Sequence, residues 1–156
     1  MTLEDGDAET IPEFIISSKD FKEGGEIPKN CGYKHGNKQP QIQLQFNPSI
    51  SAAAFALIMD DPDAMGAVGK VWVHWIYWDG MKEGKYTGRG AEGKTDFGEI
   101  GYGGPAPPDK RHTYVFKAYA LDTALDLKEG YSKQELEDAM KGHIVAEAKL
   151  TGTYAP

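Results

Sequence analysis

Glycine and proline interrupt this chain so often that its apolar segments all stay short. The 156 residues include 19 glycines and 9 prolines, which are spread between these segments. The best apolar run, residues 52–59, is far too short to cross a bilayer as a helix. Short apolar segments separated by glycine and proline are typical of strands joined by tight turns, so the sequence predicts a mainly β fold.

Two segments show the strand signal in different forms. Residues 41–46 alternate polar and apolar side chains, as expected of a strand with one buried face. Residues 53–59 are apolar throughout, which indicates a strand buried on both faces. Four further segments are expected to be strands: residues 14–18, 71–78, 114–121 and 146–154.

One helix is signalled near the C-terminus. Ser132 can cap it, and Glu135 three residues later completes a capping box. An apolar face follows at helical spacing, formed by Leu136, Ala139 and Met140. Gly142 stands where a helix terminator is expected, and residues 143–147 are expected to begin a second short helix.

The length, the cysteine content and the charge limit the possible organisation, location and partners of the chain. We expect one domain over residues 13–156, after a flexible N-terminal segment formed by residues 1–12. Cys31 is the only cysteine, and the acidic N-terminus lacks the basic and apolar parts of a secretory signal, so we expect a cytoplasmic protein. The net charge of −7 disfavours nucleic acid and anionic membranes as partners, although a few donors in a cleft can still bind an anion.

An acidic cluster follows the apolar run. Asp60, Asp61 and Asp63 surround Pro62, and by itself this pattern predicts an acidic turn. The alternative is that one of the carboxylates points inward and holds a histidine. The pattern does not favour a calcium loop, because the later ligand positions and the bidentate glutamate are missing.

A histidine lies within the aromatic segment 71–78. Alternation along a strand would place Trp72, His74, Ile76 and Trp78 on one face. Taken alone, His74 is best explained as a core residue, but a buried polar side chain still needs a partner, because an unpaired one costs about 1–3 kcal/mol.

A glycine- and proline-rich loop, residues 101–111, leads to a second histidine. Alone it predicts a rigid connection, and its glycine spacing does not fit a nucleotide phosphate loop. His112 and Tyr114 follow it and would share a face of the next strand.

Several strings occur together in a fixed order. They are residues 55–64 (Phe-Ala-Leu-Ile-Met-Asp-Asp-Pro-Asp-Ala), 71–75 (Val-Trp-Val-His-Trp), 96–98 (Asp-Phe-Gly), 101–108 (Gly-Tyr-Gly-Gly-Pro-Ala-Pro-Pro), 112–116 (His-Thr-Tyr-Val-Phe) and 146–154. Across residues 14–154 they resemble the phosphatidylethanolamine-binding protein family, also called Raf kinase inhibitor proteins, in its bacterial and archaeal branch.

The resemblance implies a pocket that accepts a phosphate-like anion. Carried over by motif, its residues would be Asp61, Asp63, Trp72, His74, Ala106, Pro107, Pro108, His112 and Tyr114. The implied fold is an antiparallel β-sandwich with Greek-key connections and one or two short C-terminal helices. Three positions depart from the family pattern, so the pocket rim is expected to differ. Met65 replaces a proline that commonly follows a cis bond, Ala106 stands where many relatives have glycine or cysteine, and Thr113 replaces an arginine.

Three functions remain open from the sequence. The first is binding of a phosphorylated small ligand, and the second is inhibition or regulation of a kinase or a protease. The third is a histidine–aspartate hydrolase or a metal enzyme, since Asp61, His74 and His112 offer two imidazoles and one carboxylate. Catalysis is the less favoured reading because no activated nucleophile is evident. We expect no cofactor and no metal, and either a monomer or a homodimer.

Overall fold

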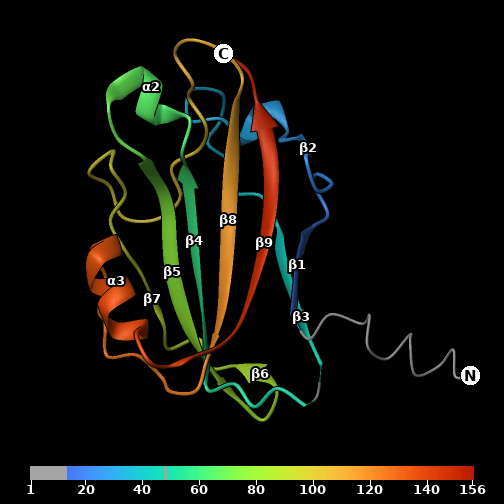
Figure 1. Ribbon diagram of the computed structural model, residues 1–156, viewed down its shortest axis with the longest axis vertical. Helices are drawn as coiled ribbons and strands as arrows, with labels where there is room; N and C mark the ends of the chain where they lie inside the picture. Colours follow the sequence, from blue (N-terminus) through green and yellow to red (C-terminus); the bar gives the residue numbers. More distant parts are fainter. Residues whose placement is uncertain (1–13, 48) are drawn as a thin grey trace, which may run out of the picture.

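The computed structural model describes residues 14–47 and 49–156, which form mainly strands (Figure 1). The segment expected to be flexible, residues 1–12, lies outside the described residues. No helix within the described ranges is long and apolar enough to cross a membrane.

The larger of two sheets has seven strands and carries the site. Its order is β2-β9-β8-β4-β5-β6, with β7 paired to β5. The strands are β2 (Gly25–Glu26), β4 (Ala54–Asp61), β5 (Trp72–Lys82), β6 (Lys85–Tyr86), β7 (Ala91–Glu92), β8 (His112–Leu121) and β9 (Ile144–Tyr154). All neighbours are antiparallel except β2 and β9, which pair in parallel. The expectation of purely antiparallel sheets is therefore wrong at this pairing, and the sheet is mixed.

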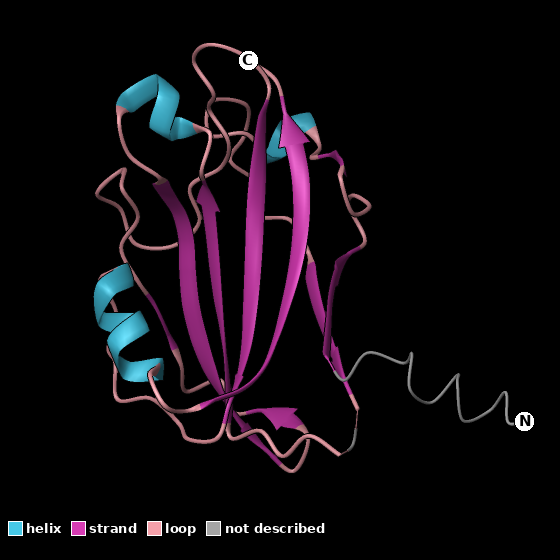
Figure 2. Ribbon diagram, in the orientation of Figure 1, coloured by secondary structure: helices cyan, strands magenta, loops and turns pink. Residues whose placement is uncertain are grey.

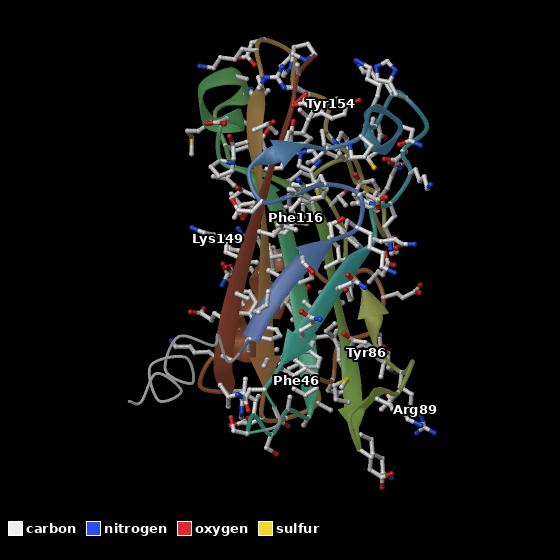
Figure 3. All side chains as sticks on the ribbon, turned by 90° about the vertical axis from the view of Figure 1, so that its right-hand side faces the viewer. Phe46, Tyr86, Arg89, Phe116, Lys149 and Tyr154 are labelled. Carbon is white, nitrogen blue, oxygen red and sulfur yellow. The ribbon has the colours of Figure 1, made fainter. Side chains whose placement is uncertain are left out.

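The second sheet pairs β1 (Phe14–Ser18) with β3 (Ile42–Phe46) and lies against one face of the larger sheet (Figures 1 and 3). An apolar cluster fills the space between them, with Phe14, Phe55 and Phe116 among its members. A second cluster lies on the opposite face, under helix α3 (Lys133–Met140), and includes Ile58, Ile76 and Leu136. The remaining helices are a 3-10 turn, η1 (Lys29–Cys31), and α2 (Ala64–Val68) (Figure 2).

The predicted strands are all present, and most extend beyond the predicted bounds. β4 is buried at every position, as the continuous apolar run predicted. Its odd-numbered side chains from Phe55 to Met59 join the first cluster, and its even-numbered ones from Ala54 to Ile58 join the second. Hydrophobic burial on both faces makes this strand the centre of the molecule.

A β-bulge overturns the predicted alternation along β5. Met59 pairs with Trp75, but the next residue, Asp60, pairs with Val73, so His74 has no partner on β4. The extra residue reverses the facing of the strand. Ile76 and Trp78 therefore face the α3 side, whereas His74 shares the opposite side with Trp75. The prediction that His74 lies on one face with Ile76 and Trp78 is wrong for this reason.

The C-terminal helix is confirmed and the second one is wrong. Ser132 accepts a hydrogen bond from the Glu135 amide, and the Glu135 side chain accepts one from the Ser132 amide, which completes the capping box of α3. Residues 144–147 begin β9 instead of a helix, because Ile144 and Val145 are β-branched and the segment pairs with β8. The sequence also did not indicate α2, which follows the acidic cluster and ends at Gly69 with a φ of 79°.

Candidate functional site

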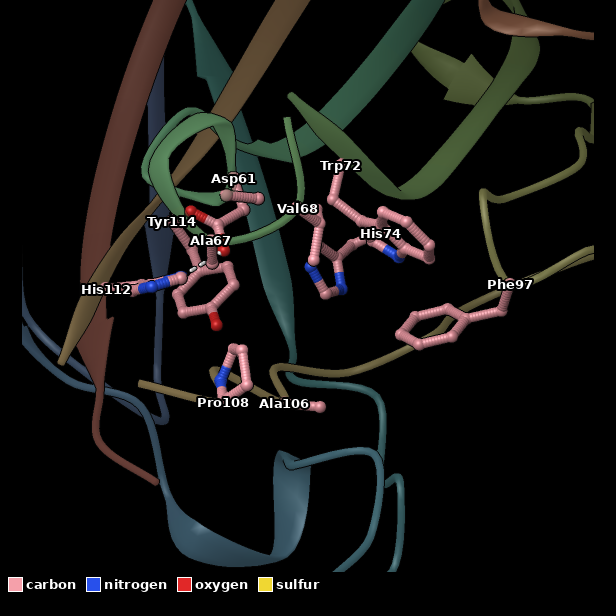
Figure 4. Close-up of a pocket in the computed structure, with 11 residues that line it drawn as sticks. Asp61, Ala67, Val68, Trp72, His74, Phe97, Ala106, Pro108, His112 and Tyr114 are labelled. Carbon is pink, nitrogen blue, oxygen red and sulfur yellow. Dashed lines mark hydrogen bonds and ion pairs between the residues drawn. The ribbon is translucent and has the colours of Figure 1, made fainter. Parts of the chain in front are cut away.

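A small cavity of about 130 Å³ lies beneath α2, at the C-terminal end of β4 and the N-terminal ends of β5 and β8 (Figure 4). Its lining residues are Asp61, Ala64, Ala67, Val68, Trp72, His74, Phe97, Ala106, Pro108, His112 and Tyr114. Three strands supply the polar groups, and α2 and the loop before β8 supply most of the apolar wall. Carboxylate, imidazole and phenol groups from separate segments thus converge on one mostly apolar space.

His112 sits between two carboxylates. Its Nδ1 lies 2.6 Å from Asp61 Oδ2, and its Nε2 lies 2.7 Å from Asp109 Oδ1. Carboxylate oxygens only accept, so both ring nitrogens donate and the ring is an imidazolium. Burial opposes the charge, but the hydrogen bonds to Asp61 and Asp109 outweigh it and raise the pKa of His112.

His74 has a different environment across the cavity. Its Nδ1 donates to the carbonyl of Gly103 at 2.7 Å, and its own carbonyl accepts from the Gly103 amide at 2.8 Å. Burial lowers the pKa of His74, because the hydrogen bond and the nearby Asp61 only partly offset the loss of hydration. The ring is therefore neutral near pH 7. Its Nδ1 carries the proton, so its Nε2 is a free acceptor.

Two buried polar atoms of the cavity have no hydrogen-bond partner among the described residues. They are Oδ1 of Asp61 and Oη of Tyr114. Figure 4 shows both residues on the same side of the pocket, with the Tyr114 hydroxyl directed toward Ala106 and Pro108. Burial, followed by the charge of Asp61, strongly raises the pKa of Tyr114, so its hydroxyl stays protonated. One orphan atom is therefore an acceptor and the other is a donor, and each costs about 1–3 kcal/mol until a ligand or water satisfies it.

The apolar wall is built from stacked aromatic rings. Phe97 contacts Trp72 edge-on at 5.6 Å between ring centroids, and Tyr33 stacks on Phe97 at 4.0 Å. Phe97 also meets the His74 ring edge-on at 5.5 Å. These rings limit access of water and strengthen any hydrogen bond made inside.

Seven of the nine residues expected from the resemblance line this cavity, and Asp63 and Pro107 do not. The Asp63 carboxylate is exposed and accepts a hydrogen bond from the Thr113 amide at 2.8 Å, so it holds the start of β8. Pro107 lines a neighbouring cavity together with Lys34, His35 and Tyr154.

Sequence reasoning missed several wall residues and one polar contact. The bond between Ala64 and Met65 is trans, and α2 begins at this point, which brings Val68 over the cavity. Phe97 belongs to a string that carries the family resemblance, yet nothing local marks it as a wall. Asp109 precedes His112 by three residues, and this spacing was the only available signal of their contact.

Metal binding receives no geometric support in the described part of the chain. No group of three or more histidine, cysteine, aspartate or glutamate side chains there is arranged to hold a metal ion. The cavity lining also contains no serine, threonine, cysteine or lysine among the described residues.

The fold and the cavity define a class: mainly β proteins with a small, aromatic-walled pocket at the end of the central strands. The sequence profile described as "Phosphatidylethanolamine-binding protein" matches residues 17–155. The chain belongs to this family.

Its relatives include proteins from archaea and bacteria. A UPF0098 protein of Methanothermobacter thermautotrophicus is 39% identical over 145 residues, covering 86% of this chain and 93% of the relative. The crystal structure of CT736 from Chlamydia trachomatis, described as a homologue of this family, superposes with a TM-score of 0.76 at 36% identity, covering 92% of this chain and 98% of that one.

Two more solved structures share the fold. YbcL from E. coli, described as a new member of the mammalian family, gives a TM-score of 0.79 at 28% identity, covering 91% of this chain and 98% of that one. A carboxypeptidase Y inhibitor, solved in complex with its cognate proteinase, gives 0.59 at 17% identity, covering 97% of this chain and 91% of that one. At that identity the inhibitor supports the fold alone.

Proposed function

We propose that this protein binds a small phosphate-like anion, as the free ion or as a phosphomonoester, in the cavity between His74 and His112. The orphan pair formed by Asp61 Oδ1 and Tyr114 Oη carries this proposal. A protonated phosphate group offers an acceptor for the Tyr114 hydroxyl and a P–OH donor for the Asp61 oxygen. It therefore satisfies both atoms at once, which a purely apolar ligand cannot do.

The charges of the site decide which protonation state is bound. Asp61 next to an anion is unfavourable unless a proton lies between the two oxygens. A phosphomonoester loses its second proton near pH 6, so its monoanion is common at mildly acidic pH and scarce at pH 8. Neutral His74 can also take up a proton when an anion arrives. Both effects predict tighter binding at pH 6 than at pH 8.

Binding is favoured over catalysis and over inhibition of another protein. The described cavity lining holds no serine, threonine, cysteine or lysine, and the Tyr114 hydroxyl stays protonated. An activated nucleophile is therefore missing from this lining. An inhibitory role toward a kinase or a protease would use the outer surface, and its support is limited to the complex described for the distant carboxypeptidase Y inhibitor.

The test is calorimetric titration of the wild-type protein and Tyr114→Phe with inorganic phosphate and with phosphoethanolamine, at pH 6 and pH 8. The variant removes only the orphan hydroxyl. We expect affinity for phosphate to fall about tenfold to hundredfold, since a hydrogen bond to a charged group contributes about 1.5–3 kcal/mol. The free energy of unfolding is expected to stay equal or rise, because an unsatisfied buried group has been removed.

Tyr131→Phe is the matched control. Its hydroxyl donates to the Ala91 carbonyl at 2.7 Å, on the far side of the larger sheet. We expect this variant to lose about 0.5–1.5 kcal/mol of stability and to keep its phosphate affinity. Absence of phosphate binding at both pH values, or equal affinity at pH 6 and pH 8, would contradict the proposal.

A further inference from the structure

Every hydrogen-bond donor of His112 is already occupied in this structure. Asp61 holds Nδ1, and Asp109 holds Nε2. An incoming anion can therefore bond to the His112 ring only by displacing one of the two carboxylates. The site cannot offer its strongest cationic donor without an internal rearrangement.

The two carboxylates differ in how easily they can leave. The Asp61 side chain is 4% exposed and extends from the end of the central strand β4. The Asp109 side chain is 43% exposed and lies on the loop that also supplies Ala106 and Pro108 to the cavity wall. An exposed carboxylate that swings outward is rehydrated at once, whereas Asp61 has no such escape. Asp109 is thus the group that an anion displaces.

The charge of the cluster changes when Asp109 leaves. With both carboxylates ionised, Asp61, Asp109 and the His112 imidazolium carry a net charge of −1, which repels an anion. Without Asp109 the remaining pair is neutral. Burial of Asp109 is outweighed by the hydrogen bond from His112, which lowers the pKa of Asp109 and keeps it charged near neutral pH.

We propose, resting on the anion-binding function above, that Asp109 is a built-in competitor for the anion site and a specificity-determining residue. As a tethered carboxylate it competes at an effective concentration on the order of millimolar or more. A free carboxylate such as acetate offers His112 no better partner than Asp109 and is excluded. A phosphate carries more oxygens and also satisfies Asp61 and Tyr114, so it displaces Asp109.

The experiment compares phosphate and acetate binding to wild type, Asp109→Ala and Asp109→Asn by calorimetry at pH 6. We expect Asp109→Ala to bind phosphate about tenfold more tightly, the gain expected if Asp109 blocks His112 in roughly nine molecules of ten. Acetate binding is expected to become measurable in this variant only. Asp109→Asn removes the charge but retains an oxygen that can accept from His112, so we expect an intermediate gain.

Asp122→Asn is the matched control. Asp122 is an exposed carboxylate, and its Oδ1 lies 2.7 Å from His143 Nδ1, beyond the opposite end of β8. The substitution removes the same charge from the same kind of contact and should leave both affinities unchanged. An equal gain in phosphate affinity in Asp122→Asn would show that the change in net charge alone causes the effect, and it would overturn the proposal.

An NMR titration of Asp109 distinguishes two roles for this residue: competing with the anion for His112, or only positioning the His112 ring. When phosphate saturates the wild-type protein, the carboxyl ¹³C resonance of Asp109 should titrate closer to its ordinary pKa of 3.8, because the His112 contact is lost. If Asp109 only positions the ring, its titration stays unchanged and Asp109→Ala weakens phosphate binding, which overturns this inference and leaves the proposed function intact. If no protein in the series binds phosphate, the proposed function itself fails.

Discussion

Asp60 and Asp61 are neighbours at the end of β4, yet they serve opposite faces of the same sheet. Asp60 faces the α3 side, where its Oδ2 lies 3.2 Å from Lys133 Nζ and 3.7 Å from Lys117 Nζ. Asp61 faces the cavity and pairs with the buried His112 at 2.6 Å. Both residues are buried, so burial alone does not distinguish them.

The difference lies in the partners. The side chain of Lys117 is 40% exposed and that of Lys133 is 26% exposed. Both are flexible, so they can follow Asp60 or return to water. His112 is 1% exposed and locked between two carboxylates. Each aspartate has an Oδ1 without a partner among the described residues, but only that of Asp61 lies in a cavity beside a second orphan, Tyr114 Oη. A carboxylate with adaptable partners serves the fold, and one with a rigid partner beside an unpaired donor fits a binding site.

Replacing His112 is expected to produce the largest effect. His112→Leu leaves Asp61 buried without a cation and should lower the free energy of unfolding by about 3–5 kcal/mol at pH 7. Urea denaturation followed by tryptophan fluorescence measures this loss.

The double variant Asp61→Leu/His112→Leu serves as the control for cavity or packing damage. It removes both charges together, so most of the lost stability should return. A double variant as unstable as His112→Leu would show that packing damage, and not the unpaired Asp61 carboxylate, causes the loss of stability.

Histidine titration distinguishes the roles of Asp60 and Asp61 with variants that destabilise the fold less than His112→Leu. In ¹H–¹⁵N spectra we expect His112 to titrate above its ordinary pKa of 6.5 and His74 to titrate below it. Asp61→Asn should lower the pKa of His112 clearly, and Asp60→Asn should leave it nearly unchanged. Equal shifts from both variants would contradict the assignment of Asp61 as the partner of His112.

These two pKa shifts also give opposite signs to the pH dependence of stability. The folded protein holds the His112 proton more tightly than the unfolded chain does. The stabilisation from His112 is therefore complete below pH 6.5 and is lost as pH rises through the folded pKa. His74 resists protonation when folded, so its contribution is present above pH 6.5 and is lost as pH falls below that value.

Local patterns predicted the fold well where the signal lies within a single segment. The continuous apolar run gave the central strand, and the Ser132–Glu135 capping box gave α3. They failed where tertiary pairing decides. The bulge at His74 depends on the register between β4 and β5, and residues 144–147 become a strand because β8 offers a partner. Neither pairing can be read from the segment itself.

The candidate site followed a similar division. The family strings named Asp61, His74, His112 and Tyr114, which the fold brings together around one cavity. They did not indicate that Asp109 occupies Nε2 of His112, because this contact depends on the conformation of a loop. The local acidic pattern alone did not separate Asp60 from Asp61, since the facing of each side chain is fixed by the strand register; the resemblance selected Asp61.

The smallest expected effect concerns the lysines of Asp60. Lys133→Met should cost at most about 1 kcal/mol, because the lysine is partly exposed and Lys117 remains within reach of Asp60. Lys117→Met should behave in the same way. The double variant is expected to lose clearly more than the sum of the two, because Asp60 then stays buried with no cation, as Asp61 does in His112→Leu. Strict additivity in urea denaturation would mean that neither lysine compensates for the other. Asp60 would then not be the adaptable counterpart of Asp61 that the structure indicates.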